Sequence, residues 1–265
     1  MRNSQLFWGG ILLLVGGFML ASEMGIKLPN GMSLMELLWP LGLILAGLWV
    51  LFGVFLRGKV DVETASVDLQ GANTASLKIS HGAGELKIHS GAKPNELAHG
   101  SFAGGLDHKA TRNGDRLEVH MRPAKDVMDF PFFGPRVQLD WDVALNPQVP
   151  TALTLNVGAN KAILDLRDLN LTDLKLETGA SDTHVTLPVQ GRYRADFDLG
   201  AASLVVTVPD GLSARIRASV GMAEVKVDES RFPRSGNYYQ SPDFESAAST
   251  VDMTIDAGAA SIRVS

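Results

Sequence analysis

Histidines and carboxylates are the side chains with which this sequence could carry out acid–base or metal chemistry, because it contains no cysteine. Six histidines are scattered along the chain without the H-E-x-x-H spacing of a zinc site: His81, His89, His99, His108, His120 and His184. Catalysis needs a nucleophile, a base and an orienting group brought together, and no spacing here indicates them. His81 takes an apolar slot before Gly82, where a buried, hydrogen-bonded histidine is the simpler interpretation. We therefore predict no catalytic residue, no metal site and no enzymatic activity.

Two further motifs resemble ligand sites without completing them. Gly82-Ala83-Gly84 is similar to part of a dinucleotide-binding loop, but the full G-x-G-x-x-G pattern is missing and strands are expected around it. Asp165, Asp168 and Asp173 could indicate calcium or a pectinase-like β-helix. These aspartates alternate with leucines, which favours a solvated strand face, so we predict no cofactor.

The composition of the 265-residue chain excludes a nucleic-acid surface as its main feature. The formal net charge is −5, whereas phosphate binding needs an excess of Lys and Arg that releases counterions. Hydrophobic residues make up 45% of the chain, and the most apolar segments lie in the first sixty residues. We expect a globular domain attached to a membrane segment.

A glycine followed by a small residue or methionine recurs every 21 residues. The glycines are Gly158, Gly179, Gly200 and Gly221, and the same pattern occurs at Gly82 and Gly258. Residues five and three places before each glycine are apolar, such as Leu153 and Leu155, whereas those four and two places before it are polar. The apolar positions resume four and six residues after the glycine in most of the units.

Alternation on both sides of a glycine predicts two short strands that meet at a corner and share one inward face. The glycine supplies either a positive φ or a close approach of backbones. Because 21 residues cannot bury their own apolar face, successive units must stack. We predict a β-solenoid over 75–265, with an ordinary β-sandwich as the alternative, after a linker and first strand in 58–74. Less regular strands are expected near 97–102, 116–121 and 136–145, with Asn113-Gly114 as a hairpin turn.

Two insertions interrupt the repeat, at about 123–135 and 228–248. Both are rich in aromatic residues, which either cap an open end of the solenoid or dock a partner. The candidate docking residues are Phe130, Phe132, Phe133, Phe232, Tyr238, Tyr239 and Phe244.

Residues 1–57 are predicted to form a transmembrane hairpin with helices at about 3–22 and 37–56. Each segment is uncharged and about 20 residues long, enough to cross a hydrocarbon layer of roughly 30 Å. A signal peptide ending near Ala21 is the alternative for the first segment. Arg2, Arg57 and Lys59 flank the helices, whereas the loop carries Lys27. Positive residues stay inside, so we expect a multi-pass protein with a cytoplasmic C-terminal domain.

The chain resembles a known bacterial family at both ends. Phe7-Trp8-Gly9 and Leu38-Trp39-Pro40-Leu41 open the two apolar segments and are similar to the transmembrane region of LiaI/LiaF-type proteins. ASLKISHGAGELKI over 75–88 and LNLTDLKLETGASDTHVTLP over 169–188 resemble the adhesin-like, toast-rack domains of the same proteins. The resemblance implies a bacterial cell-membrane protein that acts in the response to cell-wall-active antibiotics, in a family whose archetype restrains a membrane histidine kinase.

Three functions remain open from the sequence. The first is a non-enzymatic regulator or scaffold, anchored in the lipid bilayer, that presents the solenoid to a membrane partner such as a sensor histidine kinase. The second is a structural protein that forms homo-oligomers through open solenoid ends, suggested by a chain that ends inside a strand at Ser265. The third is a carbohydrate-active β-helix enzyme, which would need convergent carboxylates and an extracellular domain.

Overall fold

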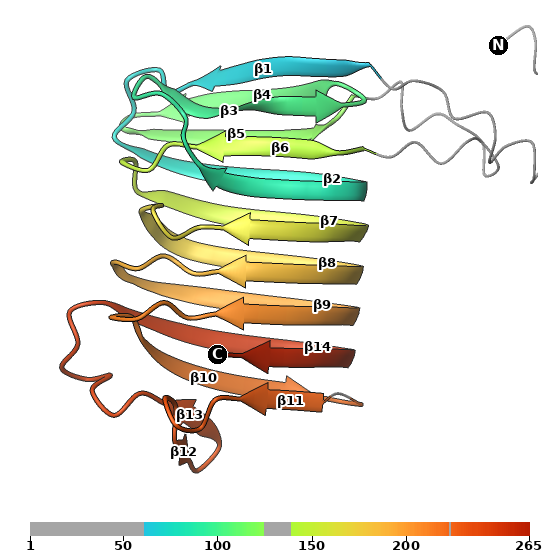
Figure 1. Ribbon diagram of the computed structural model, residues 1–265. Coiled ribbons are helices and arrows are strands. Elements are labelled where there is room, and N and C mark those ends of the chain that lie inside the picture. Colours follow the sequence, from blue (N-terminus) through green and yellow to red (C-terminus); the bar gives the residue numbers. More distant parts are fainter. Residues whose placement is uncertain (1–60, 125–138, 223) are drawn as a thin grey trace, which may run out of the picture. The chain divides into compact units, whose positions relative to one another are not determined.

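The computed structural model describes residues 61–124, 139–222 and 224–265 (Figure 1). These residues belong to one compact unit of the chain and contain fourteen strands. No helix within these three ranges is long and apolar enough to cross a membrane. The predicted spans at 3–22 and 37–56 lie outside the described residues.

Five long strands form the centre of the sheet and carry the repeat. They are β2 (Thr74–Ser90), β7 (Thr151–Asp165), β8 (Leu171–Thr186), β9 (Arg192–Thr207) and β14 (Thr250–Val264). Each is one continuous strand that bends near its glycine (Figure 1), where the sequence predicted two separate strands. We call the part before the glycine the first arm and the part after it the second arm. Neighbouring long strands pair in parallel along both arms.

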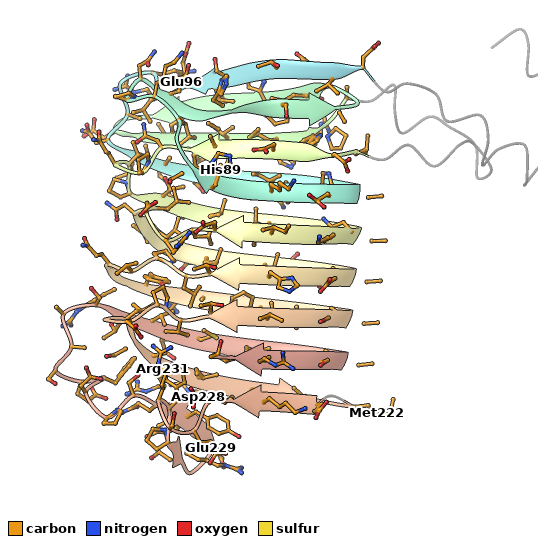
Figure 2. All side chains as sticks on the ribbon, viewed as in Figure 1. His89, Glu96, Met222, Asp228, Glu229 and Arg231 are labelled. Atoms are coloured by element: carbon orange, nitrogen blue, oxygen red, sulfur yellow. The ribbon has the colours of Figure 1, made fainter. Side chains whose placement is uncertain are left out.

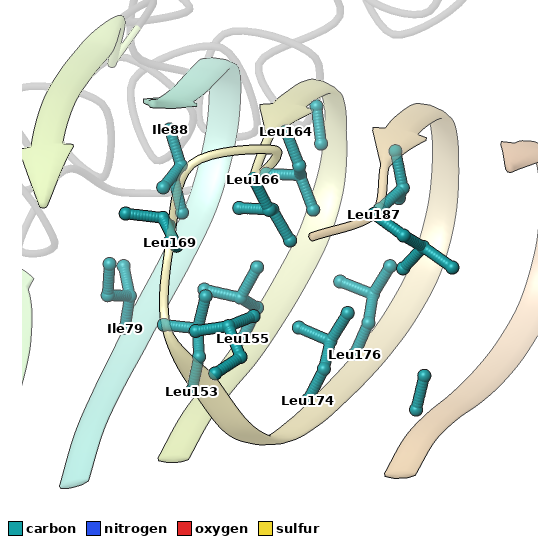
Figure 3. Close-up of a cluster of buried hydrophobic side chains, with 14 of the residues drawn as sticks. Ile79, Ile88, Leu153, Leu155, Leu164, Leu166, Leu169, Leu174, Leu176 and Leu187 are labelled. Atoms are coloured by element: carbon teal, nitrogen blue, oxygen red, sulfur yellow. The ribbon is translucent and has the colours of Figure 1, made fainter. Parts of the chain in front are cut away.

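The core lies between the two arms. In β7, Leu153 and Leu155 of the first arm and Ala162 and Leu164 of the second arm are all at most 1% exposed. Figure 3 shows such side chains from neighbouring strands filling the same interior. Each buried leucine contributes about 1.5–3 kcal/mol relative to an exposed one. The predicted inward face is therefore confirmed on both arms.

Close backbone approach explains the repeated glycine. A Cβ added at Gly158 would lie well under 3.0 Å from the carbonyl oxygen of Gly82, and one at Gly200 would lie 2.7 Å from that of Gly179. None of the repeat glycines from Gly158 onwards has a positive φ. Of the two reasons expected for glycine, the approach of stacked backbones is the one that applies at Gly158 and Gly200, whereas a Cβ at Gly82 would meet nothing within 4 Å.

Shorter strands close the N-terminal end of the stack, two of them parallel to β2 and the outer three antiparallel to their neighbours. On the second arm of β2 the sheet continues through β6 (Trp141–Leu145), β3 (Glu96–Ala103) and β1 (Val62–Asp68). On the first arm it continues through β5 (Arg116–Pro123) and β4 (Leu106–Asn113). The predicted hairpin turn joins β4 to β5, with Gly114 at a φ of 60°.

At the C-terminal end, the order of the strands in space departs from their order in the chain. β10 (Ser213–Val220) and β11 (Glu224–Val227) form the two arms of the last coil. β14 lies between β9 and this coil, so the coils of Gly200 and Gly221 are not neighbours. The expectation that the strand ending at Ser265 forms an open end of the solenoid was wrong, because β14 pairs on both sides. The end is instead formed by β10 and β11, with the hairpin of β12 (Arg234–Ser235) and β13 (Tyr238–Gln240) paired to β10.

Candidate functional site

A shallow pocket of about 460 Å³ lies at the glycine corner of the central strands. Glycine backbones form its floor, since these positions carry no side chains. Its lining residues come from β7, β8 and β9: Asn156, Val157, Gly158, Glu177, Thr178, Gly179, Asp198 and Gly200. The pocket is thus a direct product of the repeat.

An acidic row runs along this corner on the outer face of the first arms. Glu177 is in register with Asp198, and Asp198 with Asp256 of β14. The Lys175 Nζ lies 2.6 Å from Glu177 Oε1, and this contact lowers the pKa of Glu177. Like charges in register on neighbouring strands repel, so the row favours cationic groups of a partner.

The described residues offer no arrangement for a metal ion. No group of three His, Asp or Glu side chains with suitable geometry occurs within 61–124, 139–222 and 224–265. In the acidic run, Arg167 Nε donates to Asp165 Oδ1 over 2.8 Å, and Ser90 Oγ donates to Asp168 Oδ2 over 3.2 Å. Asp173 has a raised pKa, first because of burial and then because of Asp196. Asp165 and Asp168 therefore make separate local contacts, and the three aspartates form no shared metal site within the described residues.

His81 is a buried core residue, as its apolar slot predicted. It is 2% exposed, and its Nε2 lies 2.6 Å from the carbonyl oxygen of Leu139. Its Nδ1 lies 3.3 Å from Nδ2 of Asn160, an arrangement that assigns the proton to Nε2. Burial lowers the pKa of His81 more than the Leu139 hydrogen bond and Asp140 raise it. The ring also meets the edge of Trp141, with centroids 5.3 Å apart, and joins β2 to the segment that enters β6.

Gly84 is packed in a way that does not fit a dinucleotide loop. It has a φ of 115°, and a Cβ at this position would lie 2.7 Å from the backbone nitrogen of Leu139. At Gly84, the space that a ligand would need is therefore filled by the protein's own backbone.

The structure gathers four of the seven candidate aromatics at the C-terminal end. Phe232 is 1% exposed and belongs to the core, so its packing fits the capping alternative. Tyr238, Tyr239 and Phe244 are half-buried around the β12–β13 hairpin. Phe130, Phe132 and Phe133 lie outside the described residues.

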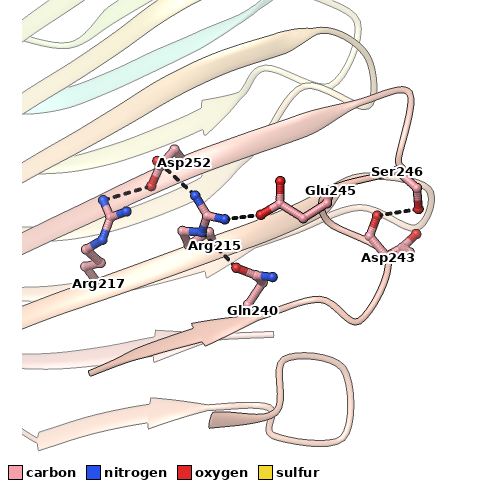
Figure 4. A network of polar contacts seen from close by, with 7 residues as sticks. All are labelled: Arg215, Arg217, Gln240, Asp243, Glu245, Ser246 and Asp252. Carbon is pink, nitrogen blue, oxygen red and sulfur yellow. Dashed lines mark hydrogen bonds and ion pairs between the residues drawn. The ribbon is translucent and has the colours of Figure 1, made fainter. Parts of the chain in front are cut away.

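Arg215 of β10 is the polar centre of this end, and the sequence analysis did not select it. Its guanidinium lies 4.3 Å from the ring centroid of Phe244 and pairs with Glu245. It also donates to Gln240 Oε1 over 2.8 Å and lies 3.9 Å from Asp252 (Figure 4). The sequence does place Arg215 and Arg217 on the same face of one strand. Their partners lie 23 to 37 residues further along the chain, so local spacing does not indicate the network.

The corner of the last coil stands clear of this network. Met222 is 85% exposed and lies at the tip of the turn between β10 and β11 (Figure 2). Val220, Val225 and Val227 beside it are partly buried, whereas Leu199, Leu204 and Val206 of β9 are at most 2% exposed. The apolar interior is therefore less covered here than inside the stack.

The described fold and its surfaces define a β-solenoid domain that presents side chains on rigid arms. A model of the N-terminal domain of toast_rack, DUF2154, matches residues 56–207, which is more than half of the chain. The chain therefore belongs to the toast-rack family. A model of the LiaI-LiaF-like transmembrane region matches residues 6–51, which makes it a membrane protein of the LiaI/LiaF type.

One of two similar solved structures shares the fold. A proposed cell adhesion protein from Clostridium sporogenes is 21% identical, with a TM-score of 0.68 over 78% of this chain and 99% of that chain. A proposed adhesin from Bacteroides fragilis is 8% identical, with a TM-score of 0.32 over 79% of this chain and 98% of that chain. No curated protein matches the sequence. The first likeness shows a common architecture.

Proposed function

We propose that this protein is a non-enzymatic regulator or scaffold of the bacterial envelope-stress response, which presents its solenoid to a membrane partner such as a sensor histidine kinase. The observation that carries the proposal is the union of a LiaI-LiaF-like transmembrane region with a toast-rack domain in one chain. Only residues 52–55 separate the two matched segments. A partner of the solenoid is therefore expected at the same membrane.

The surface of the solenoid suits a binding role. Its arms are held by parallel pairing across five long strands, so side chains on the outer faces have fixed spacing. The acidic row of Glu177, Asp198 and Asp256 and the half-buried aromatics at the C-terminal end are two distinct chemical features for a partner to recognise. The proposed side of the membrane is the cytoplasm, on the basis of Arg2, Arg57 and Lys59.

Protease accessibility tests the proposed topology. A tag after Ser265 should be protected in intact spheroplasts and digested after permeabilisation. A periplasmic protein of the same cells serves as the control for protease activity. Digestion of the tag in intact spheroplasts would contradict the cytoplasmic placement. The partners of the solenoid would then be expected on the outer side of the membrane.

A transcriptional reporter tests the proposed regulation. Deleting the gene in the source bacterium should change the output of a kinase-dependent promoter under a cell-wall-active antibiotic, and the full chain should restore it. Glu177→Gln/Asp198→Asn, which neutralises two of the three carboxylates of the acidic row, should restore less than Asp182→Asn, which changes a carboxylate on the second arm. A reporter that responds equally with and without the gene would contradict the proposal.

A further inference from the structure

The open strand edges of the solenoid differ in how they are protected. Among the strands that the structure describes, β1, β4, β11 and β12 pair on one side only. β4 turns His108 and Arg112 to the same face as Ala110, which packs on the core. A charged side chain on this face, here Arg112, discourages further pairing. On β1, the inward-facing Glu63 accepts a hydrogen bond from the N–H of Leu106 over 3.0 Å, which ties that edge to β4.

β11 lacks such protection. Its inward residues, Val225 and Val227, are apolar and pack on the core, while Glu224 and Lys226 face outwards with 2.7 Å between Oε1 and Nζ. The β12–β13 hairpin pairs with β10 only at Arg215 and Ile216. The half of the last coil nearer the corner, including β11 and the exposed Met222, is left uncovered by the hairpin.

The hydrogen-bonding groups of β11 that face the open edge can be assigned. The N–H of Asp228 donates to the carbonyl oxygen of Val264 in β14. Successive residues of a strand direct their N–H and C=O groups to opposite sides. Glu224 and Lys226 therefore share the β14 side with Asp228, and Val225 and Val227 direct theirs to the open edge.

This assignment limits how a second copy of β11 can pair with the first. When two copies of β11 pair antiparallel about a two-fold axis, only residues that direct their N–H and C=O groups to the open edge can form hydrogen bonds across the pair. Val225 can therefore lie opposite either Val225 or Val227 of the second copy. The second register places Lys226 opposite Lys226 and Glu224 opposite Asp228, which repel. The first places Glu224 opposite Lys226 twice, in non-hydrogen-bonded pairs where side chains lie closest. A register centred on Val227 would need the residues after Asp228 to continue the strand. The chain turns there instead, with hydrogen bonds to the Asp228 carbonyl oxygen.

We propose that the protein forms a two-fold dimer by antiparallel pairing of β11 with β11 of a second copy, centred on Val225. The edge is self-complementary, since opposite charges meet across the pair on the outer face and Val225 meets Val225 on the inner face. The hairpins lie on opposite sides of the axis, because each one covers the half of its coil away from the corner. The dimer is independent of the proposed signalling role and holds whichever partner the solenoid binds.

Cysteine cross-linking in membranes tests the register, and the chain contains no cysteine to interfere. Full-length chains carrying Glu224→Cys and Lys226→Cys, with different tags, are co-expressed and oxidised. Disulfides should join the two different chains at least about five-fold more than two Glu224→Cys chains, because a close Cβ separation is needed. Ser261→Cys, exposed on the neighbouring β14, is the control and should stay monomeric. Equal cross-linking of all pairs, or none above the control, would overturn the proposal.

Charge exchange gives a second readout without cysteines. Recovery of one tagged full-length chain with another should fall roughly five-fold for Glu224→Lys and for Lys226→Glu, because each creates two like-charged pairs. The double variant Glu224→Lys/Lys226→Glu should recover the original association. Single variants without effect, or a double variant weaker than either single one, would refute self-pairing and leave a different partner or a monomer.

Discussion

Replacing Gly158 by alanine should destabilise the solenoid, because this glycine carries the tightest contact in the repeat. The new Cβ would lie well under 3.0 Å from the Gly82 carbonyl oxygen and 3.3 Å from its carbon. Both atoms are backbone, so β2 and β7 must move apart locally. We expect Gly158→Ala to weaken the parallel pairing of these two strands.

The magnitude follows from two opposing effects. Overpacking in a close-packed region costs about 1–3 kcal/mol, whereas Gly→Ala at an ordinary φ stabilises by about 0.4–1 kcal/mol through the unfolded chain. The repeat provides matched positions: an alanine Cβ at Gly200 would meet the Gly179 oxygen at 2.7 Å, one at Gly179 would meet Gly158 at 3.4 Å, and one at Gly82 would meet nothing within 4 Å. Stability should therefore fall for Gly158→Ala and Gly200→Ala, and stay equal or rise for Gly179→Ala and Gly82→Ala.

Urea unfolding of the full chain in detergent, followed by circular dichroism of the β-sheet signal, measures the difference. Midpoints should rank Gly82→Ala and Gly179→Ala level with or above the original sequence, and Gly200→Ala and Gly158→Ala below it, with m-values unchanged. If all four alanines shift the midpoint alike, backbone approach is not the reason for the repeated glycine.

Three further predictions concern the core and the C-terminal end. Phe232→Ala should cost about 3–5 kcal/mol in the free energy of unfolding, and a loss under 1 kcal/mol would mean that the ring is not the core residue its 1% exposure indicates. Arg215→Ala should speed proteolysis within 241–249, since it removes contacts worth about 1–2 kcal/mol, whereas the more exposed Arg217→Ala should not; equal cleavage rates would contradict this. Because burial lowers the pKa of His81 from 6.5, the unfolded chain binds a proton more readily than the folded one. Stability should therefore be full above about pH 7 and fall as pH drops through 6.5, and His81→Gln should flatten that fall in urea titrations at pH 5–8.

Much of the architecture could be predicted because local pattern and tertiary packing agree in the repeat. Alternation around Gly158, Gly179 and Gly200 indicates which side chains face inwards, and the structure buries Leu153, Leu155 and their equivalents as expected. The burial of His81 was also predictable, since it occupies a position of the alternating pattern whose side chains face the interior. The hydrogen bond to Leu139 was not, because its partner is 58 residues away.

The C-terminal end shows where the pattern stops being informative. The sequence places Gly221 one repeat after Gly200, yet β14 lies between their coils. Period-two alternation is the same in every strand, so it identifies faces without identifying neighbours. The insertion at 228–248 allows the chain to leave the last coil and return as β14. Its composition does not indicate between which strands β14 will pair.

The sequence by itself determined the repeat, the inward face, the apolar spans and the family resemblance, because each depends on residue types at short spacing. Only the tertiary structure decided that β14 is enclosed, that Phe232 is core, that Arg215 joins the hairpin to the last coil, and that β11 remains an open edge. These properties depend on which distant segments pair. Parallel pairing adds its energy only after long loops have closed, and many strand orders share one local pattern, so the whole packed chain selects among them.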